Sequence, residues 1–365
     1  MPLPSTSPPL CEDSPKVQLA RRIARDLIDE PDALFVHLVG SVATGTDSAD
    51  SDVDVIVAID RDIDMSEEYQ EHDGIRLGIE RYPASHFLQL AETPILDLEG
   101  LRNCGRFDRG HVLASRWPDL ERVQRAWRHA RLDPNEAKEL FDLADAYLDP
   151  ELLAQQDSDT DGVWMIQGAA SAVAMMALVL EPCRFQKPKW VLHDLRAAGA
   201  DALVQILDRV HMNGTVGAAE AERCLQASEA SLAEACRMAN LPLLSFDPSH
   251  GATRVYIHQT HRDAVSLWHD GDHSGCAFTA LYALRLMNIH LQRDDAPPSE
   301  EVAPELLGAW RIRALETALP GGPPSLESLA DAIHGLRTIL DDLRRRYAAL
   351  PALPPEILAA GPQTQ

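Results

Sequence analysis

Two aspartates that follow a Gly-Ser pair are the residues whose types and spacing point most directly to chemistry. Asp52 and Asp54 stand at the start of the apolar segment VDVIVAI. Side chains two positions apart on a strand point to the same face, so the two carboxylates would project together. Neighbouring carboxylates repel each other unless a cation lies between them. Oxygen ligands of this kind suit Mg²⁺, which takes one or two carboxylates together with substrate phosphates.

The Gly-Ser pair, Gly40 and Ser41, ends the preceding apolar segment ALFVHLV. Glycine lets the backbone come close to a phosphate, and exposed N–H groups with a hydroxyl can hold its oxygens. The two halves together predict a site for a metal ion and a nucleoside triphosphate. The alternative is a surface turn followed by an acidic strand edge, which would have to explain the turn, the small residues and the two acids at once.

The whole pattern resembles the signature of the polymerase β-like nucleotidyltransferases. It runs from a hydrophobic residue and Gly-Ser, through ten intervening residues, to Asp-hydrophobic-Asp. It is most similar to the small-substrate branch, which includes the aminoglycoside and the minimal nucleotidyltransferases. The motif positions are filled by Val39, Gly40, Ser41, Asp52, Val53 and Asp54. The resemblance implies an NTP, expected to be ATP, as co-substrate and Mg²⁺ as cofactor, with Asp52 and Asp54 on the metal and Gly40 and Ser41 on the phosphates.

The resemblance also implies a third carboxylate on a neighbouring strand, and the best placed is Glu80. The period of two in RLGIE puts Arg76, Gly78 and Glu80 on one face. Glu80 would complete the metal site or take the proton of the acceptor. Many relatives carry an acid where Gly78 stands, and the alternative for Glu80 is a solvent-facing strand end. Asp73, in an expected turn, is a weaker candidate.

A pair of lysines, Lys187 and Lys189, forms half of the four lysines in the chain. Some relatives place basic residues of a helical domain against the triphosphate, and this pair is similar in kind. Lysine is a compact point charge that suits the β- and γ-phosphates. The alternative is a solvated helix start in which Trp190 belongs to the core.

Other charged clusters favour plainer interpretations. The arginine-rich segment between residues 101 and 131 has no accompanying series of aromatic residues, so it predicts a surface helix rather than a nucleic-acid interface. The histidines at residues 258, 261, 269 and 273 follow no zinc-ligand spacing.

The elements that must position these residues follow from the hydrophobic periodicity. An α+β nucleotidyltransferase domain is expected at 16–131, with a short mixed sheet and flanking helices, and a helical domain is expected at 135–350. Residues 1–15 are predicted to form a disordered lead, and residues 351–365 are predicted to form a frayed tail. Strands are predicted at 33–39, 53–59, 75–82 and 110–116, and helices at 16–30, 118–131, 135–148, 162–180, 189–208, 218–239, 260–292 and 325–349.

The composition limits the classes of partner and the cellular compartment that we expect for the protein. The chain has 365 residues, of which 33 are basic and 57 acidic, so its net charge of -24 makes long nucleic acid an unfavourable partner. Six scattered cysteines without a two-residue spacing indicate free thiols in a reducing, cytoplasmic compartment. The N-terminus lacks the pattern of a secretory signal, and the uncharged run from Val163 to Leu180 has acidic flanks that favour a buried helix over a membrane span.

These observations favour one reaction. A nucleoside monophosphate, expected to be AMP, would pass from Mg²⁺-bound NTP to a hydroxyl of a small cationic molecule such as an aminoglycoside, with release of pyrophosphate. Three alternatives remain open: an antitoxin-type enzyme that adenylylates a protein, a synthase that joins nucleotides into a second messenger, and a catalytically inactive nucleotide sensor.

Overall fold

The chain forms two compact units. The structure, a computed structural model, describes residues 9–47, 51–156, 158–180, 187–212, 214, 216–241, 252–292, 302–319 and 323–353. Most of the expected lead (1–8) and tail (354–365) therefore lies outside the described residues. The first unit contains the described parts of Met1–Ala137, Val179–Gln186 and Ala349–Gln365, and the second those of Lys138–Leu178 and Lys187–Ala348.

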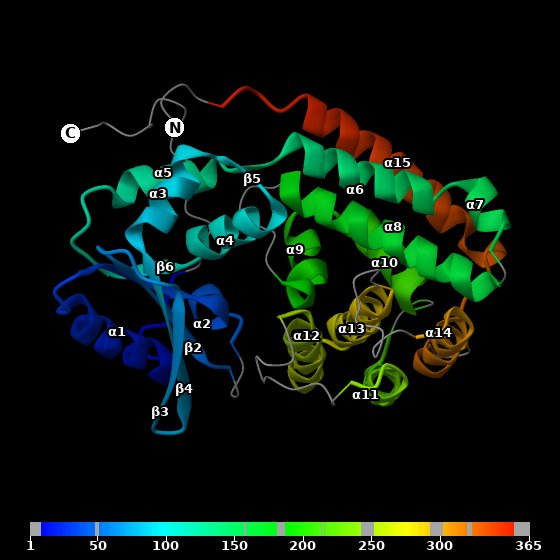
Figure 1. Ribbon diagram of the computed structural model, residues 1–365, viewed down its shortest axis with the longest axis horizontal. Coiled ribbons are helices and arrows are strands. Elements are labelled where there is room, and N and C mark those ends of the chain that lie inside the picture. Colours follow the sequence, from blue (N-terminus) through cyan, green and yellow to red (C-terminus); the bar gives the residue numbers. More distant parts are fainter. Residues whose placement is uncertain are drawn as a thin grey trace. The chain divides into compact units, whose positions relative to one another are not determined.

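A five-stranded mixed sheet is the centre of the first unit (Figure 1), with strand order β3-β4-β2-β1-β6. The β2 and β4 strands are parallel, and the other neighbours are antiparallel. This sheet, followed by a helical part of the chain, confirms the predicted α+β class. The strands are β1 (Ala33–Val39), β2 (Val53–Ile59), β3 (Ser66–His72), β4 (Ile75–Pro83) and β6 (His111–Ser115), and a separate pair is β5 (Ile95–Leu96) with β7 (Arg131–Leu132).

Each face of the sheet has its own core. On one face, residues such as Val55 and Leu77 pack against α1, with which they share a buried cluster. On the other face, an aromatic cluster joins the sheet to three helices, which Figure 1 shows together on the side away from α1. The helices of this unit are α1 (Pro15–Ile28), α2 (Gly40–Thr44), α3 (Ala84–Glu92), α4 (Leu98–Asp108) and α5 (Leu120–Arg128).

The sequence prediction missed part of this unit. The edge strand β3 has the sequence SEEYQEH, and its residues are mostly exposed, so it has no apolar alternation by which a strand could be recognised. Its pairing with β4 across a tight turn, with positive φ at Asp73 and Gly74, makes it a strand. The helices α3 and α4 were also not predicted.

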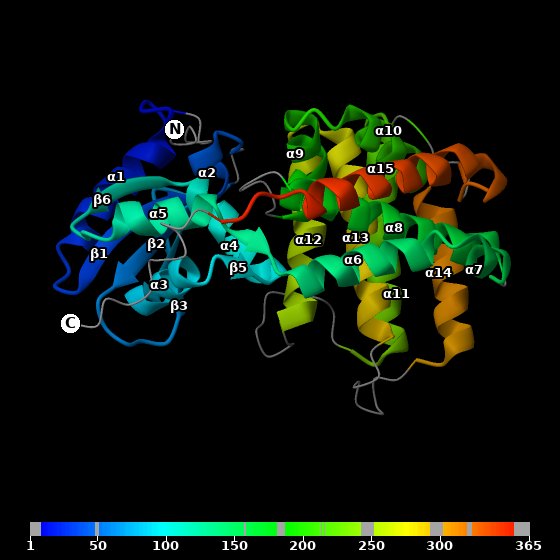
Figure 2. The ribbon, with the colours of Figure 1, turned by 90° about the horizontal axis from the view of Figure 1, so that it is seen from above.

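The second unit is helical. Figures 1 and 2 show α6, α8 and α15 running alongside one another and crossing the helices α11 to α14. Its helices, with α6 starting in the first unit, are α6 (Pro134–Tyr147), α7 (Pro150–Ala154), α8 (Asp159–Leu180), α9 (Val191–Ala197), α10 (Asp201–Met212), α11 (Ala218–Met238), α12 (Ala252–His269), α13 (His273–Leu291), α14 (Pro304–Ala318) and α15 (Ala330–Ala348).

Two helices that the periodicity predicted as single are each broken. The segment 189–208 contains the end of a short 3-10 turn, then α9, then α10, and the chain turns at Gly199 with a φ of 74°. The segment 260–292 contains α12 and α13, separated at Gly271 with a φ of 80°. In both places a glycine with positive φ lies at the break, and at the second break the Asp272 side chain caps the start of α13. The prediction also missed α14.

The α8 helix contains the long apolar run. Among the described residues, it is the one helix whose length and composition would allow it to cross a membrane. However, 78% of its most apolar window is buried inside the structure, which fits the predicted core helix.

A buried histidine makes the stability of the first unit sensitive to pH. The Nε2 of His37 in β1 donates to the Phe107 carbonyl at 2.7 Å, and the ring is 1% exposed. Burial lowers the pKa of His37 to about 4, against the opposing effect of that hydrogen bond. Between the unfolded value and this folded value, only the unfolded chain binds the proton, so stability is lost as the pH falls from about 6.5 to 4.

We therefore expect a His37→Gln variant to lose less stability than the wild type when the pH is lowered from 7 to 5. The difference should be about 2 kcal/mol, from the pH linkage of one such group. Urea unfolding at both pH values measures it. Equal losses in the two proteins would show that His37 does not stay neutral in the folded chain.

Candidate active site

The carboxylate of Asp54 lies between two glycines. Asp54 on β2 pairs with Val39 at the end of β1 on one side and with Gly78 on β4 on the other. A Cβ at residue 78 would lie 3.3 Å from Asp54 Oδ1, and a Cβ at residue 40 would overlap Oδ2. The two oxygens of this carboxylate therefore face two different glycines, one in the Gly-Ser bend and one on the neighbouring strand.

The Gly-Ser bend is the start of the five-residue helix α2. Gly40 has a φ of 75°, a conformation that glycine adopts at little cost. α2 ends at Thr44, and the next residue, Gly45, again has a positive φ; the Ser41 carbonyl accepts a hydrogen bond from Thr46 N at 3.0 Å. The first N–H groups of a helix have no hydrogen-bond partner inside the helix. The structure thus brings the bend and Asp54 together.

Asp52 lies one residue before β2 and is half-buried. It follows residues 48–50, which lie outside the described part of the chain. Among the described residues, no three His, Cys, Asp or Glu side chains are close enough together to hold a metal ion. A metal here would depend on the two aspartates and on phosphate oxygens, which is the donor set that Mg²⁺ accepts.

Glu80 lies on the same face as Asp54 and Gly78, opposite Ile56. Both of its carboxylate oxygens accept from the Arg106 guanidinium of α4, one of them at 2.8 Å, and the Tyr82 hydroxyl donates to it at 2.9 Å. Burial, the charge of Glu80 and this hydrogen bond raise the pKa of Tyr82 to about 12, so Tyr82 stays a donor. A role for Glu80 as metal ligand or base stays a prediction.

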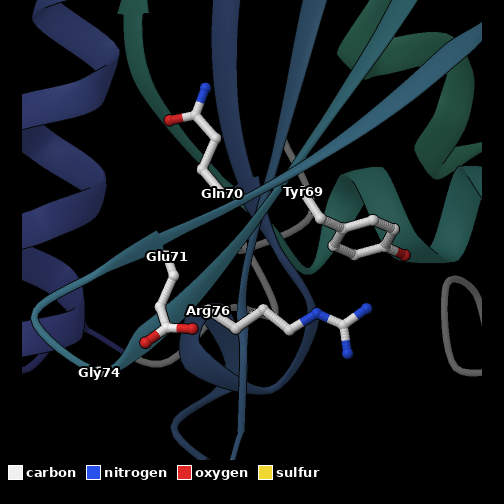
Figure 3. A pocket seen from close by; sticks show the side chains of 5 residues that line it. All are labelled: Tyr69, Gln70, Glu71, Gly74 and Arg76. Atoms are coloured by element: carbon white, nitrogen blue, oxygen red, sulfur yellow. The ribbon is translucent and has the colours of Figure 1, made fainter.

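The hairpin of β3 and β4 adds residues that the sequence did not indicate. Tyr69 pairs with Gly78, and a Cβ at residue 78 would lie 3.3 Å from the Tyr69 ring as well as from Asp54. The Arg76 guanidinium lies 4.2 Å from the centre of that ring. Figure 3 shows both side chains on one side of the hairpin, at a hollow of about 370 Å³ lined by Tyr69, Gln70, Glu71, Gly74 and Arg76.

The two lysines belong to the second unit. Lys189 Nζ forms an ion pair with Asp263 of α12 at 3.0 Å and lies 5.1 Å from the centre of the Trp190 ring. Lys187 is half-buried. The ion pair offsets the charge of Lys189 locally, and a contact of either lysine with a triphosphate stays a prediction.

The comparison with protein families matches this part of the chain. Residues 20–87 match the family model described as "Nucleotidyltransferase domain". The matched segment runs from α1 to α3 and includes the bend, both aspartates and Glu80. This segment is a nucleotidyltransferase domain. The chain is therefore a transferase, and the small-substrate branch stays a prediction.

The other comparisons add little to this domain assignment. One similar solved structure is that of a nucleotidyltransferase-like protein from Exiguobacterium sibiricum 255-15, with 11% sequence identity, covering 90% of this chain and 91% of that chain. Its TM-score of 0.32 is too low for the likeness to carry an argument. No curated protein matches the chain.

Gly40 gives a direct test of the geometry of the nucleotidyltransferase domain. Gly40→Ala should abolish measurable binding of Mg²⁺–NTP, because the added Cβ displaces the Asp54 carboxylate. The matched control is Gly199→Ala, with nearly the same φ, 74°, but nothing within 4 Å of the added Cβ. Both variants should lose about 1–2 kcal/mol of unfolding free energy from backbone strain. Calorimetric titration with urea unfolding separates the two effects, and normal binding by Gly40→Ala would contradict this geometry.

Proposed function

We propose that the protein transfers a nucleoside monophosphate, AMP in the first instance, from Mg²⁺-bound NTP to a hydroxyl of a small cationic molecule such as an aminoglycoside. The observation that carries the proposal is the Asp54 carboxylate held against the Gly-Ser bend, inside the matched nucleotidyltransferase domain. The acceptor oxygen forms a bond to the α-phosphorus, the bond from this phosphorus to the oxygen bridging it to the β-phosphate breaks, and pyrophosphate leaves.

Each residue of the site has a role in this reaction. Asp52 and Asp54 would hold the metal, while Gly40 and Ser41 bind the phosphates. Bound Mg²⁺ supplies charge that stabilises the transferring phosphate and the leaving pyrophosphate. For Glu80, the third acid of the site, the family resemblance implies a role as a metal ligand or as the group that receives the proton of the attacking hydroxyl, and the variants of the next subsection test the first of these roles. Lys187 and Lys189 are proposed to contact the phosphates.

The position of the β3–β4 hairpin suggests from which side the acceptor enters the site. In phosphoryl transfer, the attacking and leaving oxygens lie roughly in line on opposite sides of the phosphorus. Asp54 Oδ2 faces the bend and Oδ1 faces Gly78 and the Tyr69 side. If the pyrophosphate leaves at the bend, the acceptor enters from the hairpin.

The charges of the hairpin support a cationic acceptor. Register places Glu67, Tyr69 and Glu71 on the face of the sheet that carries Asp54, and all three are exposed. Two carboxylates against the one guanidinium of Arg76 leave this strip negative, and a negative strip attracts a cation.

A pyrophosphate-release screen tests the function. It uses Mg²⁺, each NTP in turn, and aminoglycosides, proteins or no acceptor. We expect release with ATP and an aminoglycoside, and a loss of roughly 100-fold or more in Asp54→Asn, because the metal loses a charged ligand. Asp60→Asn, at the exposed far end of β2, is the matched control and should keep full activity.

The other outcomes of the screen separate the alternatives. Label transferred from NTP to protein would indicate a protein-modifying enzyme, and release without an acceptor would indicate a nucleotide synthase. Binding of NTP without any turnover would indicate a sensor. Full activity of Asp54→Asn would overturn the assignment of the site.

The acceptor side has its own test. Glu71→Gln should raise the KM for the acceptor found in the screen by about 3- to 10-fold and leave the KM for NTP unchanged, because a partly solvated charge attraction is lost. Glu68→Gln is the control, since Glu68 is an exposed residue of the same strand on the opposite face. The effect of Glu71→Gln should shrink at high salt. A rise in the KM for NTP instead would place the nucleotide, not the acceptor, at the hairpin.

A further inference from the structure

Arg106 is a cation that contacts Glu80, the third acid of the site. It lies in the last turn of α4, and its side chain reaches Glu80, to which it donates through both Nη1 and Nη2. The Arg106 side chain is 24% exposed and that of Glu80 14% exposed. The carboxylate of Glu80 thus holds the guanidinium of Arg106 in place, while the Arg106 side chain stays partly exposed to solvent.

The sheet register places this pair beside Asp54. Gly78 pairs with Asp54, and Glu80 stands two residues further along β4 on the same face. Burial lowers the pKa of Arg106, but its hydrogen bonds to Glu80 and the charges of Glu80 and Asp54 outweigh this effect and raise it.

The guanidinium keeps donors for a ligand. Arginine has five N–H donors in a planar fork, and the two bonds to Glu80 use two of them. The same fork matches the oxygens of a phosphate, and a cation already held in place loses little conformational freedom when it binds.

We infer that Arg106 binds the polyphosphate of the NTP and that Glu80 is a positioning residue that holds Arg106, rather than a ligand of the metal. This inference rests on the proposed function and names a substrate contact that neither the sequence motif nor the matched family segment contains. Residue 106 lies outside the matched residues 20–87. Glu80 then fixes the plane and direction of the guanidinium, with help from the Tyr82 hydroxyl.

The two roles of Glu80 predict different patterns of loss. If Glu80 acts through Arg106, Glu80→Gln and Arg106→Gln weaken polyphosphate binding by similar factors, and the double variant is no weaker than Arg106→Gln alone. If Glu80 holds the metal, Glu80→Gln lowers the affinity for Mg²⁺, Arg106→Gln does not, and the two losses add.

The experiment is calorimetric titration of the full chain with Mg²⁺–ATP and with Mg²⁺–tripolyphosphate, which needs no acceptor. We expect Arg106→Gln to weaken both ligands by roughly 10- to 100-fold, the loss of one or two charge-assisted hydrogen bonds. Arg106→Lys should recover part of this affinity. Arg102→Gln, one turn earlier on α4 and paired with Glu99 at the surface, is the control and should bind as the wild type does.

Further controls distinguish a loss of ligand binding from a loss of folding. A single variant leaves one partner of a mostly buried ion pair unmatched, which can destabilise the chain. The double variant, in which two neutral amides replace the charges, removes this strain, and urea unfolding reports the stability of each protein. Wild-type affinity for tripolyphosphate in a folded Arg106→Gln or in the double variant would overturn the inference. A wild-type chain that binds neither ligand would instead refute the proposed function.

Discussion

The close approach of Gly40 to Asp54 is the contact on which the site depends. Antiparallel pairing of β1 and β2 brings the end of β1 next to Asp54, and the chain must leave β1 at that point without covering the carboxylate. A residue with a side chain would be unfavourable at position 40 for two reasons. Its Cβ would overlap Asp54 Oδ2, and the φ of 75° strains any L residue. One glycine therefore sets the direction of α2 and leaves room for the Asp54 carboxylate.

The sheet register determines which residues on the face that carries Asp54 belong to the core and which belong to the site. Moving away from Asp54 along β2, the same face carries Ile56 and then Ala58, which belong to the aromatic core beneath α3, α4 and α5. Glu80 stands opposite Ile56, at the boundary between the two parts. A carboxylate at such a boundary needs a partner, because burying an unpaired charge is costly. In this fold the partner of Glu80 is Arg106, and the pairing places a cation at the edge of the site.

The sequence predicted the site better than its surroundings for a physical reason. Asp52, Asp54 and the Gly-Ser bend lie close together in the chain, between two apolar strands whose pattern is clear. Arg106 is 26 residues from Glu80, and their meeting depends on how α4 crosses the sheet. The β3 strand is defined by pairing rather than by apolar residues, so Tyr69 beside Gly78 was not predictable. The broken helices failed likewise, since the prediction continued each helix through a glycine that adopts a positive φ.

Residue type alone does not decide which cations bind phosphate. Lysine is rare in this chain, which made Lys187 and Lys189 prominent, yet Lys189 is paired with Asp263 at 3.0 Å, and both side chains are less than 20% exposed. Arg106 is paired as well, so pairing itself does not separate the two. Their geometry does, because an ammonium turns its three donors about one point, whereas a guanidinium held by two of its N–H groups presents the others in a fixed plane. In a chain with a net charge of -24, most cations will have acidic neighbours. The cations that can still bind a ligand are those whose pairing leaves N–H donors unused.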